Sequence, residues 1–419
     1  MDRSPSTPAE QQKLGAWLCE FLRADVDATP GDKLSTLSAG DWQRLVPLAD
    51  RHGLSPLLYR CLEASGLETQ VPESAWLAMQ DAYRTGASRS AVQYHALAQV
   101  LQALHALDIP VIALKGAHLA EIIYESIALR PMGDLDILVQ QTDLDQTAQV
   151  LVELGYVPSQ PIVIEAEIEL AKHLPAFHRA GSTIEVHWKL APDEKPFQID
   201  VGGLWERAEP AQMAGVQALV LAPEDLLLYL CLHIAYIHRF AVGLKAFYDI
   251  VEVLRHYEER MDWEQVQRRA GQWGVSKAVY LTFHLTAQWW GLSLPAEVWE
   301  ALKPADFDPQ LAAAAGEKTL SDWSVSVPIS RDLMRSWGTQ DRGERVRVAL
   351  AKVFPQPRFL ARAYSIPPGS WRVYLYYPTR WRDLLRYYGR AGWRLLRGDK
   401  ETVAFAARET MLWDWLTSE

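Results

Sequence analysis

The sequence predicts an α+β fold, in which a small mixed β-sheet lies between helical regions at both ends of the chain. Two short segments alternate apolar and polar residues as strands do, Asp134 to Val139 and Thr183 to Trp188. The long stretches on either side carry apolar residues at helical spacing instead. We therefore expect four consecutive regions: 1–107 (helical), 108–205 (α/β core), 206–303 (helical) and 304–419 (helical, rich in arginine and aromatic residues).

Composition bounds the class of protein. The 419 residues are 49% hydrophobic and 22% charged, as in ordinary soluble proteins. Three scattered cysteines argue against a disulfide framework and fit a reducing compartment, so we expect a cytoplasmic protein. The first residues are polar and unlike a signal peptide. The longest apolar run, Leu226 to Ile237, is too short to span a bilayer and predicts a buried helix.

Charge is unevenly distributed. The net charge of −10 disfavours a general nucleic-acid-binding protein. Residues 358–397, however, hold nine Arg, no Lys and a single acid, interleaved with Trp and Tyr. Such a helix can lie on an anionic membrane or stack on nucleic acid. We favour a helix docked on the acidic remainder of the chain, with weak contact to a membrane surface as the alternative.

The first region predicts helices only. Residues 11–86 carry apolar stripes at helical spacing, and a break is expected near Gly86. A further helix is predicted from Ser88 to Leu107, and Asp108-Ile109-Pro110 ends it. Nothing in this region carries chemistry.

A strand–turn–helix follows. The strand is expected at Val111 to Leu114, the turn at Lys115-Gly116-Ala117 and the helix at about His118 to Tyr124. A strand that opens a helix in this way points backbone N–H groups and a positive dipole end at an anion. Arg130 stands four residues before the next acid, and its guanidinium suits bidentate contact with phosphate.

The second strand places two acids on one face. Asp134 and Asp136 alternate with Leu135, Ile137 and Val139, which we assign to the core face. Two neighbouring carboxylates repel each other, and a hard divalent cation with oxygen ligands neutralises them. The spacing therefore predicts a site for Mg²⁺ or Mn²⁺. A solvated strand end is the alternative, because a bare Asp-x-Asp is common.

The segment after this strand leads to a third acid. A helix from about residue 142 to Gly155 and a short strand near Val157 come first, and the acids at 165–169 read as an exposed helical face. In Thr183 to Trp188, Glu185 and His187 share the polar face. If this strand lies beside the first, Glu185 becomes a third carboxylate that binds the metal or accepts a proton. The alternatives are an edge-strand acid and an ordinary hydrogen-bonding histidine.

The third region predicts more helices. Residues 216–221 form a strand or a helix lead-in, and Pro223 begins a helix with acids in its first turn. His233 and His238 lie five apart, which is not the spacing of a zinc-binding helix. In the next helix Lys245 precedes Asp249 by four residues, so an ion pair between them is expected.

Several segments together resemble a known family. They are LKGAHLAEIIY, LRPMGDLDILV, ELGY, IEVHW and PEDLLLYLCLHIAYIH with LKAFYDIVEVL. Over roughly residues 90–257 they resemble a nucleotidyltransferase family of the polymerase-β-like superfamily. The resemblance implies Mg²⁺- or Mn²⁺-dependent transfer of a nucleoside monophosphate from an NTP, with ATP the first candidate, to an acceptor hydroxyl. The superfamily usually has Gly-Gly or Gly-Ser where this chain has Gly116-Ala117, so Lys115 or a backbone N–H must replace the serine hydroxyl.

The resemblance also assigns roles to residues. It implies metal-binding and catalytic carboxylates at Asp134, Asp136 and Glu185, with His187 as a possible further member. It implies phosphate contacts and a helical wall of the nucleotide or acceptor cleft, contributed by Lys115, Gly116, Ala117, Arg130, Lys245 and Asp249.

Other functions are weighed against this one. A catalytically inactive nucleotide- or partner-binding protein on the same scaffold is one alternative, motivated by the absent Gly-Ser pair. A phosphotransferase is the other. The motifs of P-loop kinases, Rossmann dehydrogenases, zincins and common serine hydrolases do not occur. The acceptor stays open among small molecules, peptides, proteins and lipid head groups.

Overall fold

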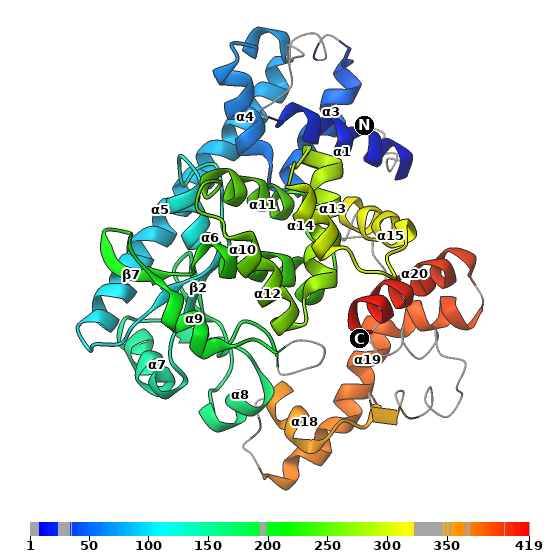
Figure 1. The fold of residues 1–419 in the computed structure, drawn as a ribbon. Coiled ribbons are helices and arrows are strands. Elements are labelled where there is room, and N and C mark those ends of the chain that lie inside the picture. Colours follow the sequence, from blue (N-terminus) through cyan, green and yellow to red (C-terminus); the bar gives the residue numbers. More distant parts are fainter. Residues whose placement is uncertain are drawn as a thin grey trace. The chain divides into compact units, whose positions relative to one another are not determined.

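A computed structural model describes residues 8–23, 34, 36–192, 198–321 and most positions from 347 to 418. The chain separates into two compact units (Figure 1). The first comprises Met1–Phe307 with Gly316–Ser321, and the second Asp308–Ala315 with Asp322–Glu419.

The first unit is built on one mixed sheet in the order β3-β4-β5-β2-β1-β7-β6. The pairs β2–β5 and β1–β7 are parallel, and the other four pairs are antiparallel. The predicted α+β class with a mixed sheet is therefore confirmed. The strands are β1 Ile112–Ala113, β2 Leu135–Leu138, β3 Val157–Pro158, β4 Phe177–Arg179, β5 Ser182–His187, β6 Glu209–Met213 and β7 Val216–Val220.

Two hairpins widen the sheet beyond the strands that were predicted. β4 and β5 are joined at Ala180-Gly181, and β6 and β7 at Ala214-Gly215. All four turn residues have positive φ, from 21° to 82°, as the tight turns of hairpins require. The Ala-Gly pair is the only turn signal in either segment, and β4 is three residues long, so neither β4 nor β6 was expected.

One face of the sheet packs on helices and forms the main core. Leu135, Ile137 and Val139 from the β2 region join Ile184 and Val186 of β5 in this core, as the alternation predicted. Helix α5 (Glu73–His105) covers this face together with α7 (Leu144–Glu153).

Helix α5 is continuous through the break expected at Gly86. It runs for 33 residues. A Cβ at Gly86 would contact the Pro131 ring at 3.4 Å, an ordinary van der Waals distance, so this glycine neither ends the helix nor is required by close packing. The expected break is wrong.

The opposite face of the sheet carries the polar side chains of β2 and β5, and a group of helices lies near it. The apolar run at 226–237 is buried, as predicted, but it divides into α10 and a π-helical turn. The described part of the chain holds no helix that is long and apolar enough to cross a membrane. These helices are α10 Pro223–Leu232, the π-helical turn His233–Ile237, α11 Lys245–His256, α12 Trp263–Trp273 and α13 Ser276–Trp290.

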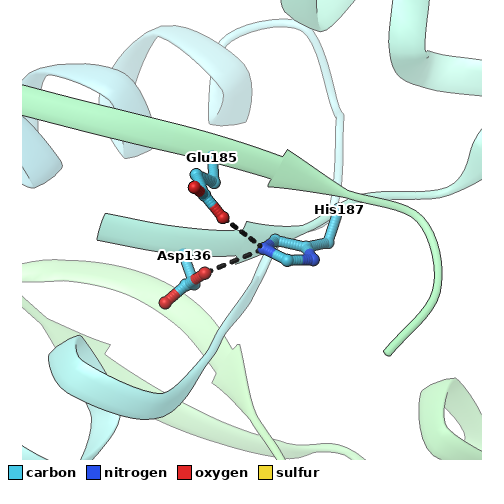
Figure 2. A group of neighbouring side chains, drawn as sticks. All are labelled: Asp136, Glu185 and His187. Atoms are coloured by element: carbon cyan, nitrogen blue, oxygen red, sulfur yellow. Dashed lines mark hydrogen bonds and ion pairs between the residues drawn. The ribbon is translucent and has the colours of Figure 1, made fainter. Parts of the chain in front are cut away.

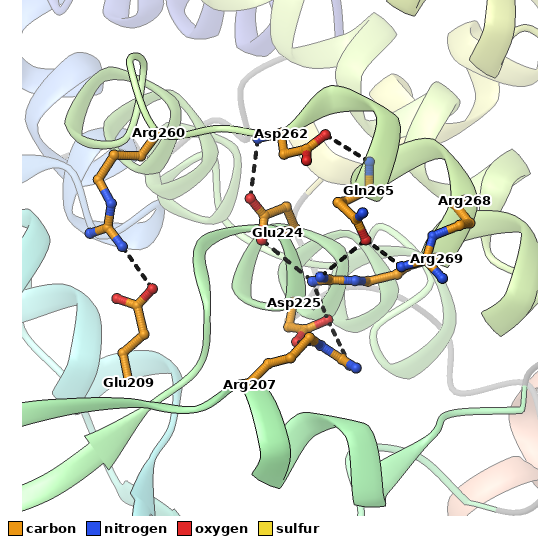
Figure 3. Close-up of polar contacts among 9 residues, drawn as sticks. All are labelled: Arg207, Glu209, Glu224, Asp225, Arg260, Asp262, Gln265, Arg268 and Arg269. Carbon is orange, nitrogen blue, oxygen red and sulfur yellow. Dashed lines mark hydrogen bonds and ion pairs between the residues drawn. The ribbon is translucent and has the colours of Figure 1, made fainter.

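A buried charge network holds α10 in place (Figure 3). Asp225 is fully buried and accepts hydrogen bonds from Arg207 at 2.8 Å and from Arg269 at 3.1 Å. Arg269 also faces Glu224 at 3.4 Å, and Glu224 accepts the backbone N–H of Asp262 at 3.1 Å. The network ties α9 (Val201–Arg207) and the start of α12 to the first turn of α10.

The remaining helices complete the two units. In the second unit, Leu360, Ala361 and Val373 form a small core with Tyr364 and neighbouring aromatic residues. The first unit adds α1 Pro8–Phe21, α3 Ala39–Arg51, α4 Ser55–Ala64, α6 Lys115–His118, α8 Ile164–Leu170 and α14 Ala296–Leu302. Helix α15 (Pro309–Leu320) includes residues of both units. The second unit further contains α18 Pro357–Ala363, the 3-10 helix Trp371–Tyr376, α19 Tyr377–Leu396 and α20 Lys400–Thr417.

Candidate active site

The two central parallel strands bring acids from distant parts of the sequence together. β2 and β5 pair in a register that sets Asp136 opposite Glu185. Residues opposite each other on neighbouring strands share a face, so both carboxylates lie on the polar face of the sheet. Figure 2 shows their side chains converging on His187.

His187 lies against both carboxylates. Its Nε2 is 2.8 Å from Asp136 Oδ1 and 3.4 Å from Glu185 Oε2, and the side chain is fully buried. One candidate ligand atom from each of the three residues lies within 4.8 Å of the others. Oxygen and imidazole groups this close together could hold a metal ion.

Asp134 stands apart from this group. It precedes β2 by one residue, and its side chain is exposed. Although it reaches solvent, the surrounding protein and the nearby charge of Asp136 raise the pKa of Asp134. The structure thus brings Asp136 and Glu185 close together and leaves Asp134 exposed to solvent just before β2. Its predicted part in metal binding stays a prediction.

Lys115 lies beside Asp136. Its Nζ is 3.1 Å from Asp136 Oδ1 and 5.7 Å from the centre of the Tyr229 ring in α10. Burial opposes a charge on Lys115, but Tyr229 and Asp136 outweigh it and raise the pKa of the ammonium. Burial would likewise raise the pKa of Asp136, yet Lys115 and the hydrogen bond from His187 hold it well below its usual range. Asp136 is therefore ionised at neutral pH.

The predicted Lys-Gly-Ala turn is the first turn of a helix. Helix α6 begins at Lys115, whose φ is +34°, and a π-helical turn (Leu119–Ile123) continues it. Gly116 leaves room for Arg130, because a side chain there would come within 3.1 Å of the guanidinium Nη1. The carbonyl of Ala117 accepts a hydrogen bond from Tyr94 at 2.6 Å. Gly116 therefore makes room for Arg130 beside the cavity, whereas Ala117 is buried in the main core.

Arg130 forms an ion pair with Asp249, so its guanidinium is not free to bind phosphate as predicted. Its Nε and Nη2 donate to the two carboxylate oxygens of Asp249, both at 2.8 Å, and Tyr124 donates to the same carboxylate. The predicted ion pair between Lys245 and Asp249 is wrong, because Asp249 pairs with Arg130. Lys245 donates instead to the carbonyl of Pro131 at 2.9 Å. Burial and the charge of Arg130 lower the pKa of Lys245 to about 8.

A cavity of about 380 Å³ lies beside Lys115. It lies between the α3–α4 turn, the end of α10 and the start of α11, and Lys115 links it to Asp136. Two of its imidazoles add little charge at neutral pH, because burial lowers the pKa of His52 to about 4 and that of His233 well below its usual value. The charged side chains on its wall are Arg51, Lys115, Arg130, Lys245, Asp50 and Asp249.

Lys172 and His173, which lie near the carboxylates, were not predicted as site residues. His173 Nε2 lies 3.8 Å from Glu185 Oε2, and an isolated bridge pairs His173 with His187. Lys172 precedes His173. Burial and the charge of Lys115 lower the pKa of Lys172 to about 8, although the negative charges of Asp136 and Glu185 act to raise it. Both residues follow α8 in a stretch without strand alternation. No sequence signal distinguishes them from a surface Lys-His pair.

Comparison with known proteins places the chain in a family. No curated protein and no solved structure matches it. A family model described as an uncharacterised nucleotidyltransferase matches residues 38–291, which is more than half of the chain. That range contains β2, β5, Lys115 and the whole wall of the cavity. The chain belongs to this nucleotidyltransferase family.

Proposed function

We propose that the protein is a divalent-metal-dependent enzyme that moves a nucleoside monophosphate from an NTP to an acceptor hydroxyl. One observation carries the proposal: Asp136 and Glu185 face each other across two parallel strands and are both partly or fully buried. Carboxylates so close together repel, and burial increases the repulsion. A bound cation removes that cost and is what nucleotidyl transfer requires.

The contacts of the carboxylates support a place for the cation. Within the described part of the chain, Lys115 and His187 both reach Oδ1 of Asp136. His187 and His173 both reach Oε2 of Glu185. Oδ2 and Oε1 are therefore available, together with the exposed carboxylate of Asp134. Three oxygen ligands suit Mg²⁺ or Mn²⁺.

His187 acts in this proposal as a hydrogen-bond donor to the carboxylates. Ionised carboxylate oxygens only accept hydrogen bonds, so the proton belongs on Nε2. The buried Nδ1 has no partner among the described residues. Binding a metal through Nε2 would move the proton to Nδ1 and bury an unsatisfied donor, which is costly. Donation by His187 therefore fits the site better than metal ligation.

The cavity supplies the place for the polyphosphate. Arg130 is neutralised by Asp249. The ammonium of Lys245 is partly buried against a carbonyl and has no carboxylate within ion-pair distance among the residues that the structure describes. A buried cation of this kind favours an anionic ligand. With Lys115 at the carboxylate end, the lysines would contact the phosphates of an NTP, with ATP as the first candidate.

The chemical roles follow from these positions. A bound cation would offset charge on the transferring phosphoryl group and align the attacking hydroxyl. Glu185 suits a ligand better than a general base, because the hydrogen bond from His187 lowers its pKa further from neutrality. Lys115 and Lys245 would orient the phosphates.

A nucleotide-binding protein without catalysis is the second candidate. The observation that favours it is the ammonium of Lys115, which lies 3.1 Å from Asp136 and offsets part of its charge, so that Asp136 has less need of a metal ion. The test is transfer of label to acceptors in a cell extract from NTP labelled at the α-phosphate and, in a parallel reaction, at the γ-phosphate, comparing wild type with Asp136→Asn. We expect metal-dependent labelling that falls at least about a hundredfold in the variant. A protein that binds NTP but never transfers label is the binder, and label transferred only from the γ-phosphate indicates a phosphotransferase.

A further inference from the structure

Helix α19 in the second unit carries two adjacent rows of contrasting side chains. Residues four apart on a helix lie on the same face. One row is apolar, apart from a glycine, and consists of Trp381, Leu385, Gly389 and Trp393. The other follows one position later and includes Arg382 and Arg386.

The apolar row is exposed. Leu385 is 73% exposed and Trp393 58%. The 3-10 helix that leads into α19 adds Trp371 at 68% and Leu375 at 62%. Single exposed apolar residues are normal in soluble proteins, but a series of large ones on consecutive elements marks an interaction surface.

The basic row gives this surface its charge. Residues 358–397 contain nine arginines and a single acid, Asp383. Asp383 is engaged within the unit, since it accepts hydrogen bonds from Tyr364 at 2.8 Å and from Arg382 at 3.1 Å. The exposed guanidinium groups of Arg372 and Arg386 complement an anionic partner.

We propose that this arginine–aromatic surface (Trp371, Leu375, Leu385 and Trp393 with Arg372 and Arg386) binds a lipid bilayer that contains anionic phospholipids. An interfacial helix buries an apolar row at the boundary of the acyl chains, and its flanking arginines contact the phosphate groups of the lipids. Tryptophan is enriched at this depth because its ring is apolar and its N–H is polar.

Nucleic acid fits the surface less well. Leu375 and Leu385 are its most exposed aliphatic residues, and aliphatic side chains do not stack on bases as aromatic rings do. The inference does not depend on nucleotidyl transfer, because it concerns residues of the second unit only.

The test is flotation of the full chain with vesicles. Vesicles of phosphatidylcholine alone are compared with vesicles that also contain phosphatidylglycerol. We expect binding to the anionic vesicles only, and its loss at high salt. The double variant Leu375→Ser/Leu385→Ser should bind at least about tenfold more weakly. Arg372→Gln/Arg386→Gln should weaken binding about twenty-fivefold, or about fivefold for each charge near the surface.

A matched control distinguishes binding by this surface from non-specific binding by other exposed residues. Leu77→Ser/Arg84→Gln removes an exposed leucine and an exposed arginine from α5 and should leave vesicle binding unchanged. The proposal is overturned if wild type does not float with anionic vesicles at low salt. It is also overturned if both double variants on α19 and the 3-10 helix bind like wild type, or if an RNA oligonucleotide binds more tightly than the vesicles do.

Discussion

At the scale of single residues, hydrogen bonds decide which carboxylate oxygens can meet a cation. Lys115 and His187 occupy the same oxygen of Asp136, at 3.1 and 2.8 Å. The other oxygen, Oδ2, accepts no hydrogen bond from the described residues and is left for a ligand. A site of this kind depends on donors that do not touch the metal as well as on the ligands themselves.

The first prediction concerns His187. His187→Phe fills the buried volume but removes the donor, so the affinity for Mn²⁺ should fall about ten- to a hundredfold. His187→Gln restores an N–H that can reach Asp136 and should keep most of the affinity. Isothermal titration with Mn²⁺ measures both, and thermal unfolding confirms that each variant folds. Equal affinity in the Phe and wild-type proteins would contradict the assigned role.

Lys245 sets the second prediction, a pH dependence of nucleotide binding. Its pKa of about 8 means that the ammonium is present at neutral pH and is lost as the pH rises through 8. The affinity for ATP should therefore decrease above pH 8. Lys245→Met should bind ATP roughly tenfold or more weakly at neutral pH, because a hydrogen bond to a charged group is lost.

The matched control for Lys245 is Arg260→Gln on the exposed loop after α11, which should leave both affinity and pH profile unchanged. Fluorescent ATP displacement across the pH range gives the readout. A Lys245→Met protein with the wild-type affinity would place the phosphates elsewhere.

At the scale of elements, α11 is joined to the segment before β2 by a buried ion pair. Arg130 and Asp249 are 9% and 4% exposed at their side chains and 119 residues apart in sequence. Because this pair also holds Arg130 against Gly116, it fixes one wall of the cavity. Removing one partner would leave a buried charge uncompensated.

That pair gives the third prediction. Asp249→Ala should lower the free energy of unfolding by about 3–5 kcal/mol, since the guanidinium of Arg130 stays buried. The exposed pair Arg260–Glu209 provides the control, and Arg260→Gln should cost at most about 1 kcal/mol. Urea denaturation measures both. A similar decrease in the free energy of unfolding in the two variants would show that the buried ion pair stabilises the fold no more than the exposed one.

Elements also show what the sequence could and could not predict. The period of two in β2 and β5 assigns Leu135 and Ile184 to the core face and Asp136 and Glu185 to the other, without knowledge of the fold. Such local periodicity does not predict which side chains from distant parts of the sequence contact each other. The local spacing of Lys245 and Asp249 suggested an ion pair, whereas the real partner of Asp249 comes from another element. Short strands such as β4 leave too few residues for a period to appear.

At the scale of the whole molecule, buried neutral histidines couple stability to pH. Burial lowers the pKa of His52 to about 4 and that of His118 to about 3, from an ordinary value near 6.5. Between these values the unfolded chain binds protons that the folded chain does not. Stability is therefore fully present above pH 6.5 and is lost as the pH falls toward 4 and 3.

The fourth prediction tests this coupling. The urea midpoint of wild type should fall between neutral pH and pH 5, and His118→Leu should reduce the fall because one buried site no longer titrates. His105→Leu is the control, since this exposed histidine at the end of α5 should leave the pH dependence unchanged. An identical slope in the His118→Leu protein would contradict the assignment.

The measurement that tests the central claim most directly is a crystal structure of the wild-type protein with Mg²⁺ and a non-hydrolysable ATP analogue. We predict a cation about 2.0–2.1 Å from oxygens of Asp136 and Glu185, with the phosphates beside Lys115 and Lys245. A nucleotide bound away from the cavity, or a complex with no cation between β2 and β5, would contradict the proposed transferase.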